Sequence, residues 1–160
     1  MMTDELFLAW SAGFFDGEGS IVIELSKSEG SKSGYRTSLH ATVTQTSIPC
    51  LQRYQDFFGG SIKTFQHTCP NSRRWSVQYT WSVRNEKALA FLRAIKKYSV
   101  VKSEQIDTAL QYPLYAENGK KYGNKSNPMP EHIWGKRLEL RTKLQDIRAS
   151  MKTKAEVRHG

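Results

Sequence analysis

The hydrophobic pattern of the chain begins with a helix. Phe7, Trp10 and Phe14 recur at positions i, i+3 and i+7, which places three bulky side chains on one helical face that is expected to meet a core. Thr3 or Asp4 is suited to cap this helix, because a short side-chain oxygen accepts a hydrogen bond from a free backbone N–H. A second face consists of small residues and one acid: Ala9, Ala12, Gly13 and Asp16. A face of this kind lets another helix approach closely.

From Ser20 the apolar period changes to two, which indicates a strand with one buried face. A polar stretch follows, and a return strand is predicted from about Arg36 to Gln45. The residues expected to face inward on these two strands are Ile21, Ile23, Leu25, Leu39, Ala41 and Val43. Pro49 suits the first turn of a following helix, which the glycines at 59–60 end.

The same strand, strand and helix order then recurs. Ile62 faces inward on a predicted third strand, and alternation through residues 74–83 predicts a fourth. The inward residues of the fourth strand are Trp75, Val77, Tyr79, Trp81 and Val83. Helical spacing covers residues 89–98, so residues 20–98 contain two copies of one unit. The predicted fold class is α+β, with a four-stranded antiparallel sheet and helices on one face.

A single domain is predicted over residues 1–160, with a core over about 5–115. Beyond the two units the expected segments are a helix at roughly 102–111, a polar linker at 117–130, a helix at about 131–150 and a frayed tail at 151–160. Five apolar residues support the last helix: Ile133, Leu138, Leu140, Leu144 and Ile147.

The other face of the predicted sheet is rich in polar and basic side chains. Its candidate DNA-binding residues are Ser20, Glu24, Ser26, Arg36, Ser38, His40, Thr42, Lys63, His67, Arg74, Ser76, Gln78 and Thr80. Such groups can read base edges in a major groove, where arginine pairs well with guanine and glutamine with adenine. The polar loop at residues 26–36 would contact phosphates or more distant bases. An ordinary solvated sheet face has a similar composition, and that alternative stays open.

The charge of the chain favours a polyanionic partner. The 160 residues include 24 Lys and Arg against 15 Asp and Glu, a formal net charge of +9. Nucleic acid is the first candidate, although a basic surface can also serve only solubility. The 2 cysteines are too few for a disulfide framework and fit a reducing, intracellular compartment. No apolar run approaches the roughly 20 residues that span a bilayer, so no membrane partner is expected.

Two acids, Asp16 and Glu18, lie where the first helix has to end. The free carbonyl groups at a helix C-terminus carry partial negative charge, so a carboxylate there is unfavourable unless a cation is close. A divalent metal ion would remove this conflict by binding a carboxylate, a backbone carbonyl and phosphate oxygens. Gly13, Gly17 and Gly19 permit close helix contact and unusual backbone angles.

The stretch "SAGFFDGEGS" at residues 11–20 resembles the LAGLIDADG motif of homing endonucleases. The predicted order of strands and helices resembles the same family over about residues 5–115. Ser11 stands where the family usually has leucine, and Glu18 where aspartate is common. Pro49 aligns with a position where some relatives have a basic residue, so a second active-site cation is not assigned. The resemblance implies the αββαββα homing-endonuclease fold.

The resemblance also implies the roles of individual residues. Glu18 would bind the catalytic metal beside the carbonyl of Gly17, while Asp16 orders the helix end. The implied ion is Mg²⁺, for which Ca²⁺ or Mn²⁺ can substitute, and no organic cofactor is implied. Gln45, which ends the segment "VTQT", would orient water near the metal. Lys102, in "VVKSEQ", resembles an active-site lysine of the family that supports the developing charge or perturbs the attacking water.

A single copy of the motif is visible, and single-motif members of the family act as homodimers. By this resemblance the dimer interface consists of Ala9, Ala12, Gly13 and Asp16. An isologous contact suits two equivalent helices, and it would place two active sites on opposite strands of the DNA. Packing of the small face on the protein's own helices is the alternative.

The implied function is site-specific hydrolysis of double-stranded DNA at a long pseudo-palindromic target, with short 3′ overhangs, in support of intron or intein-type mobility. Such a protein would reside in an organelle or in a prokaryotic cell. The rival functions are an RNA-splicing maturase and a non-cleaving DNA-binding protein of the same fold. A small RNA-binding domain is disfavoured because the sheet lacks paired exposed aromatics. A zinc site built from His40, Cys50, His67 and Cys69 is disfavoured because no CxxC pair is present.

Overall fold

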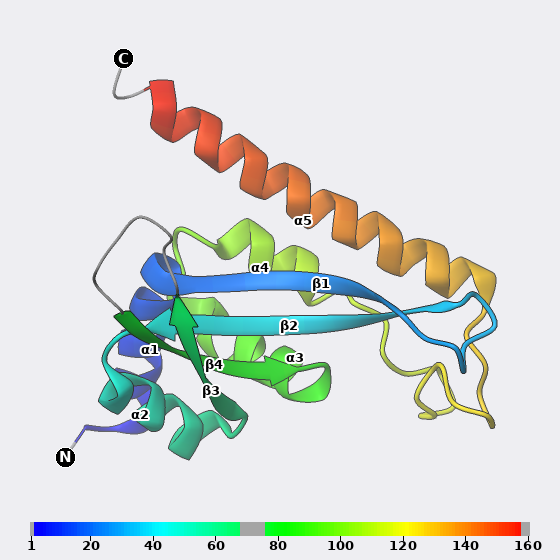
Figure 1. Ribbon diagram of the computed structural model, residues 1–160, viewed down its shortest axis with the longest axis horizontal. Helices are drawn as coiled ribbons and strands as arrows, with labels where there is room; N and C mark the ends of the chain where they lie inside the picture. Colours follow the sequence, from blue (N-terminus) through cyan, green and yellow to red (C-terminus); the bar gives the residue numbers. More distant parts are fainter. Residues whose placement is uncertain (1, 68–75, 158–160) are drawn as a thin grey trace. The chain divides into compact units, whose positions relative to one another are not determined.

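A computed structural model describes residues 2–67 and 76–157 of the chain. Its elements are α1 (Asp4–Glu18), β1 (Gly19–Lys27), β2 (Tyr35–Gln45), α2 (Ile48–Phe58), β3 (Ser61–His67), β4 (Ser76–Arg84), α3 (Glu86–Ile95), the 3-10 helix η1 (Lys96–Tyr98), α4 (Ser103–Ala109) and α5 (Glu131–Val157) (Figure 1). This order confirms the predicted α+β class. The predicted inward position of Trp75 lies outside the described residues.

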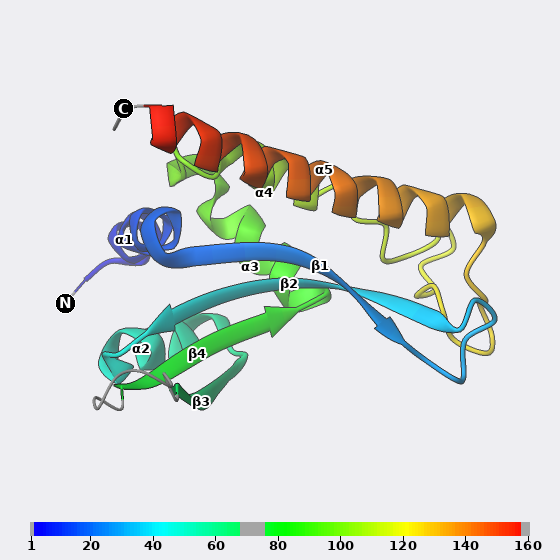
Figure 2. The same ribbon diagram turned by 45° about the horizontal axis from the view of Figure 1, so that its top comes forward.

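The four strands form one sheet in the order β1-β2-β4-β3, which confirms the predicted antiparallel arrangement (Figure 2). Strands β2 and β4 pair with Val43 opposite Trp81, and strands β3 and β4 pair with Ile62 opposite Trp81. Successive side chains alternate between the two sheet faces. Val43, Ile62 and Trp81 therefore share the face that α2 and α3 cover through their contacts with β4.

The chain divides into two compact units, one formed by residues 1–20 and 40–103 and the other by residues 21–39 and 104–160. The centre of the first unit is an aromatic cluster of Tyr54, Trp81 and Phe91. Their ring centroids lie 4.9 to 5.9 Å apart, and Trp81 meets both neighbours edge to face, which aromatic quadrupoles favour. The Tyr54 hydroxyl donates to the carbonyl of Ser11 at 2.5 Å and so joins α2 to α1.

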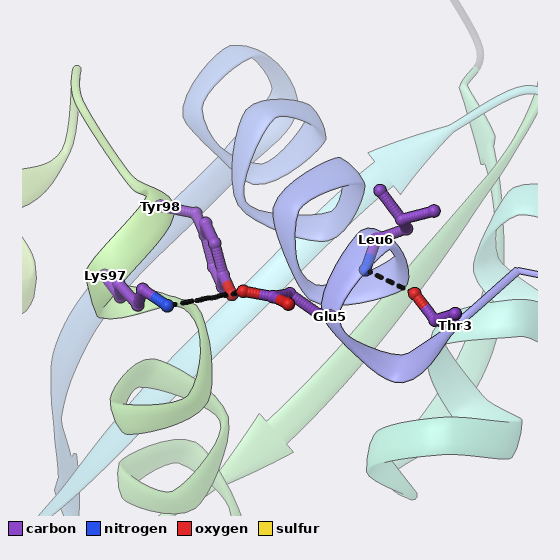
Figure 3. A network of polar contacts seen from close by, with 5 residues as sticks. All are labelled: Thr3, Glu5, Leu6, Lys97 and Tyr98. Carbon is purple, nitrogen blue, oxygen red and sulfur yellow. Dashed lines mark hydrogen bonds and ion pairs between the residues drawn. The ribbon is translucent and has the colours of Figure 1, made fainter.

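The buried face of α1 is rotated from the predicted stripe. Thr3 caps the helix as expected, since its Oγ1 accepts from the Leu6 N–H at 3.3 Å (Figure 3). The predicted stripe is only partly buried: Phe7 is buried, but Trp10 and Phe14 are half-exposed and stack on each other. The residues with no exposed surface are Ser11, Ala12 and Phe15. The spacing rule identified a helix but not the centre of its buried face, because all three large aromatics still find ring contacts at the edge of the core.

The second unit packs α5 through Leu140, Leu144 and the buried Arg137. The Arg137 guanidinium donates to the carbonyl of Pro113 at 2.8 and 3.0 Å and lies 4.6 Å from the centre of the Tyr112 ring. With a further hydrogen bond from Nη1 to the Thr37 hydroxyl at 3.3 Å, each guanidinium nitrogen has an acceptor. The helix continues to Val157, beyond the end expected at about residue 150.

Two predicted inward residues, Leu25 on β1 and Val77 on β4, are each 37% exposed. Both lie near a strand end, where alternation sets which side a residue faces but not whether another element covers it. Ile21, Ile23, Leu39, Ala41 and Val43 are buried as predicted. Within the described residues, no helix combines the length and apolarity that crossing a membrane requires.

Candidate active site

The two acids at the end of α1 have different environments. Asp16 is half-buried and Glu18 is exposed. An α-helix has 3.6 residues per turn, so side chains two residues apart point in directions that differ by about 200°. Asp16 and Glu18 have this spacing and therefore start from nearly opposite sides of the helix. The last turn of α1 contains no basic residue, and Gly19 ends the helix by donating its N–H to the Phe15 carbonyl. A side chain at Gly19 would overlap the ring of Phe15, which explains the glycine here.

The Asp16 carboxylate accepts hydrogen bonds from the segment that precedes α4. The Ser99 hydroxyl donates at 2.5 Å, and the backbone N–H groups of Val100, Val101 and Lys102 donate at 2.7, 3.0 and 3.1 Å. Burial by itself would raise the pKa of Asp16, but these hydrogen bonds stabilise the charged form and lower the pKa below its ordinary value. These contacts tie the last turn of α1 to residues 99–102, and the ordering of the helix end by Asp16 stays a prediction.

Lys102 supplies a cation at the end of α1. Its side chain is 9% exposed, and its Nζ donates to the backbone carbonyl oxygen of Asp16 at 2.6 Å. Burial lowers the pKa of Lys102, while the Asp16 and Glu18 carboxylates act in the opposite direction. A positive group near free carbonyls is the arrangement that the helix dipole favours. The hydrogen bonds on Asp16 and the Lys102 ammonium group therefore offset the negative charge of Asp16 at the helix end, and the Lys102 charge acts on Glu18 as well, although Glu18 has no hydrogen-bond donor of its own.

The Glu18 side chain has no hydrogen bond or salt bridge with any residue in the described part of the chain, and its charge acts on Lys102 only at longer range. Its neighbour Gly17 is exposed, and the space beside its Cα is open to 4 Å. An accessible carboxylate next to an accessible stretch of backbone offers oxygen ligands, which Mg²⁺ and Ca²⁺ prefer. Among the described residues, no three His, Cys, Asp or Glu side chains gather into a metal-binding group. The donors present thus fit a metal ion that takes its other ligands from water and phosphate.

Gln45 ends β2 on the same face as Val43. It is half-buried, and its Oε1 accepts from the Thr46 N–H at 3.2 Å. Since β1 begins directly after Glu18 and runs antiparallel to β2, the start of β1 and the end of β2 lie at the same end of the sheet (Figure 2). The sheet topology brings Gln45 towards the end of α1. Lys102 contacts the end of α1 directly, through its hydrogen bond to the Asp16 carbonyl.

In the first unit the open sheet face is formed by alternate residues of β2, β3 and β4. The predicted Thr42, Lys63, Gln78 and Thr80 lie on it, as the strand register requires. Thr44, whose hydroxyl is 2.8 Å from that of Thr80, lies on this face as the predicted alternation requires, although it is not among the candidate DNA-binding residues. Phe65, which is 51% exposed opposite Gln78, also lies there and was not predicted. Extending the alternation that places Lys63 on this face would have found Phe65.

The other predicted DNA-binding residues occupy varied positions. His40 and Ser20 in the first unit are half-buried, and the backbones of His67 and Ser76 pair where β3 meets β4. Arg74 lies outside the described residues. In the second unit Glu24 is exposed, Ser38 is half-buried, and the exposed Arg36 donates from Nε to the Ser26 hydroxyl at 3.3 Å.

The predicted dimer interface is partly taken up by the protein's own packing. Ala12 has no exposed surface, so its prediction as an intersubunit contact is wrong: it faces the core of its own unit. The Asp16 carboxylate is engaged by residues 99–102. Ala9 is half-buried, and Gly13 is exposed, with no atom within 4 Å of the place that a Cβ would occupy. Ala9 and Gly13 remain available to a second helix.

Residues 11–114 match the sequence family described as LAGLIDADG endonuclease, so the chain belongs to that family. No curated protein sequence matches the chain. Solved structures with the same fold include the homing endonuclease I-CvuI in complex with its target, at 20% identity and a TM-score of 0.67 over 90% of this chain and 83% of that one. The archaeal intron-encoded homing endonuclease I-Vdi141I with DNA has 19% identity and a TM-score of 0.69 over 91% and 86%.

A third similar structure belongs to a longer chain. The meganuclease I-SmaMI, bound to uncleavable DNA, has 20% identity and a TM-score of 0.59, covering 87% of this chain but 43% of its own. At these identities the structures establish the homing-endonuclease fold for this chain. The family match includes the end of α1, β1 and β2, and the loop before α4, so it spans all three predicted catalytic residues.

The hydrogen bonds on Asp16 predict a pH-dependent contribution to stability. Because the folded-state pKa is lowered, ionised Asp16 stabilises the fold above the ordinary aspartate pKa of about 3.9, and this stabilisation is lost as the pH falls through the folded value. We expect Asp16→Asn to lower the free energy of unfolding by about 2 kcal/mol at pH 7, since an amide accepts these bonds less well. The difference should shrink below about pH 4.

Urea denaturation between pH 3 and pH 8 measures this difference. Asp56→Asn on α2 is the matched control, because Asp56 is exposed in the same unit. It should change stability little at any pH. A loss in Asp16→Asn that stays constant over the whole pH range would contradict the role given to the ionised carboxylate.

Proposed function

We propose that this protein is a site-specific endonuclease that hydrolyses double-stranded DNA with the help of a divalent metal ion. The main supporting observation is the exposed Glu18 carboxylate at the end of α1, which makes no side-chain hydrogen bond or salt bridge among the described residues and interacts only through the longer-range charge of Lys102. Support comes from membership of the LAGLIDADG endonuclease family and from a polar sheet face with few acids. We further propose that cleavage at a DNA site without the intron or intein promotes the mobility of the genetic element that encodes this protein.

The metal would be held by the Glu18 carboxylate and the Gly17 carbonyl oxygen, and Mg²⁺ is the ion we propose. When bound, it would supply positive charge that stabilises the phosphoryl and leaving oxygens during hydrolysis. I-CvuI has been crystallised with its target in 2 mM Ca, and with another target in 2 mM Mg, where the DNA was not cleaved. Those conditions support a divalent ion in the fold and leave its identity in this chain to experiment.

The protein's own groups have separate tasks in the proposed reaction. Gln45 would hold a water molecule through its side-chain amide at the end of β2. Lys102 would stabilise negative charge that develops on the phosphate, because its ammonium group is buried and already oriented by the Asp16 carbonyl. The sheet face would bind the flanking major groove through side chains on alternate positions.

Glu18→Gln tests the metal-binding role. We expect the variant to lose about 10²–10³-fold or more in cleavage rate while it keeps its affinity for DNA, because the amide has no charge to hold a divalent ion. Cleavage sites are first selected from a randomised duplex library in Mg²⁺, and single-turnover rates are then measured on the selected site. Glu117→Gln is the matched control, since Glu117 is exposed in the second unit. Cleavage by Glu18→Gln at the wild-type rate would assign the metal to other ligands.

The sheet face predicts two different effects of substitution. Gln78→Ala should relax base preference at one position of the target, at a cost of about 1–3 kcal/mol for the preferred base. Lys63→Ala should weaken binding to all sequences alike and reduce the salt dependence of log Kd by about 1. Binding titrations at several salt concentrations on a panel of single-base variants separate the two. Gln52→Ala, an exposed position on α2, should have neither effect. An unchanged target profile in Gln78→Ala would remove this residue from base recognition.

We also propose that the protein acts as a homodimer through α1. This chain corresponds to 43% of I-SmaMI, and it contains one copy of the motif. Gly13→Glu should yield a monomer, because Gly13 is exposed and its surroundings leave room for a side chain within its own subunit. Gly135→Glu on α5 is the control, another helical glycine with open space. Sedimentation velocity should show a dimer for the wild type and the control. A dimer in Gly13→Glu would place the interface elsewhere.

A further inference from the structure

The segment Ser99, Val100, Val101 and Lys102 follows a path that its side-chain packing does not explain. Val100 is 81% exposed and Val101 is 57% exposed, so the two apolar side chains bury little surface in the subunit. Burial of apolar surface is the usual force that fixes a loop. Apart from one backbone hydrogen bond from the Ser99 N–H to the Ile95 carbonyl at 3.1 Å, what holds this loop is the Asp16 carboxylate, which accepts from the Ser99 hydroxyl and from three successive backbone N–H groups.

A second contact, on the protein surface, involves the two residues directly before this segment. The Tyr98 hydroxyl donates to the Glu5 carboxylate at 2.9 Å, and Lys97 Nζ lies 3.4 Å from the same oxygen (Figure 3). The Lys97 and Glu5 side chains are 73% and 71% exposed, so water competes for this pair and it constrains the chain weakly. The two anchors differ in strength, and Asp16 is the stronger one.

The contact between α1 and the loop is reciprocal. The Asp16 side chain fixes the backbone of residues 100–102, and Lys102 in turn donates from Nζ to the Asp16 backbone carbonyl at 2.6 Å. Because the Lys102 backbone N–H itself donates to the Asp16 carboxylate at 3.1 Å, the hydrogen bonds that hold the loop also fix the position from which the lysine side chain extends. Misplacement of a reacting or charge-stabilising group by about 1 Å can cost about 100-fold in rate.

We propose that Asp16 is a positioning residue for Lys102: its carboxylate fixes the 99–102 loop so that the lysine ammonium is held at the end of α1. This inference rests on the proposed function for its effect on cleavage, since it requires that Lys102 support the reaction. The proposal gives the two acids of the motif different roles. Glu18 faces outward to metal and DNA, and Asp16 acts only through Lys102.

A double-mutant cycle tests the proposal. Single-turnover cleavage is measured for the wild type, Asp16→Asn, Lys102→Met and the double variant, with DNA affinity measured in Ca²⁺. We expect Asp16→Asn to slow cleavage by about 100-fold and to change affinity by less than about threefold. In the Lys102→Met background, Asp16→Asn should slow cleavage by less than about threefold, because the group it positions is gone. An equal loss in both backgrounds would overturn the proposal.

Two further variants guard against a folding defect. Ser99→Ala removes one of the four hydrogen bonds on Asp16 and should slow cleavage by a smaller factor that also vanishes in the Lys102→Met background. Glu5→Gln weakens the outer anchor and should leave the rate within about twofold. Loss of rate in Glu5→Gln equal to that in Ser99→Ala would point to general loosening of the segment and overturn the specific role of Asp16.

A readout that does not depend on cleavage separates this inference from the proposed function. The ¹³Cε signal of Lys102, assigned by its absence in Lys102→Met, reports the surroundings of the ammonium group. It should shift in Asp16→Asn and Ser99→Ala and stay in place in Glu5→Gln. A shift without any DNA cleavage by the wild type would support the positioning and sink the endonuclease function. An unmoved signal in Asp16→Asn would sink the positioning whatever the enzyme does.

Discussion

The arrangement of the candidate site depends on how the protein stabilises negative charge at the C-terminus of α1. Free carbonyl groups make this a poor place for a carboxylate. The structure resolves the problem for Asp16 with one hydroxyl and three backbone N–H groups from residues 99–102, and it satisfies a helix carbonyl with Lys102. Residues distant in sequence thereby become neighbours, and the lysine is held in place at the end of the helix.

The same constraint separates the functions of the two acids. Positions two apart on a helix point in nearly opposite directions, so one carboxylate can turn to the protein while the other faces solvent. Asp16 is half-buried and fully engaged, and Glu18 is exposed. In the proposed function, a motif of two acids and several glycines therefore combines a structural anchor with a ligand for an external cation. Gly19 belongs to this design, because the Phe15 ring occupies the place of a side chain there.

DNA binding, the second part of the proposed function, is assigned to the sheet. The alternation of polar and apolar residues along its strands predicts which side chains lie on its open face. Strand register follows from the period of two, so Thr42, Lys63, Gln78 and Thr80 lie on the open face where the pattern put them. The exposed Phe65 lies beside them on β3 and adds an apolar surface next to Gln78. If this face binds a major groove as proposed, an apolar side chain on it is suited to contact a thymine methyl group.

The sequence by itself determined the fold class, the order of the elements, the two faces of the sheet and the position of the acids at the end of α1, because these depend on local periodicity and on residues close in the chain. Only the tertiary structure decided which face of α1 is buried, with Ala12 inside, and that the inward-facing Leu25 on β1 and Val77 on β4 stay partly exposed. It also showed that Asp16 is satisfied by residues 99–102. These outcomes depend on which distant segment covers a surface or donates to an acid, and no local pattern encodes that pairing.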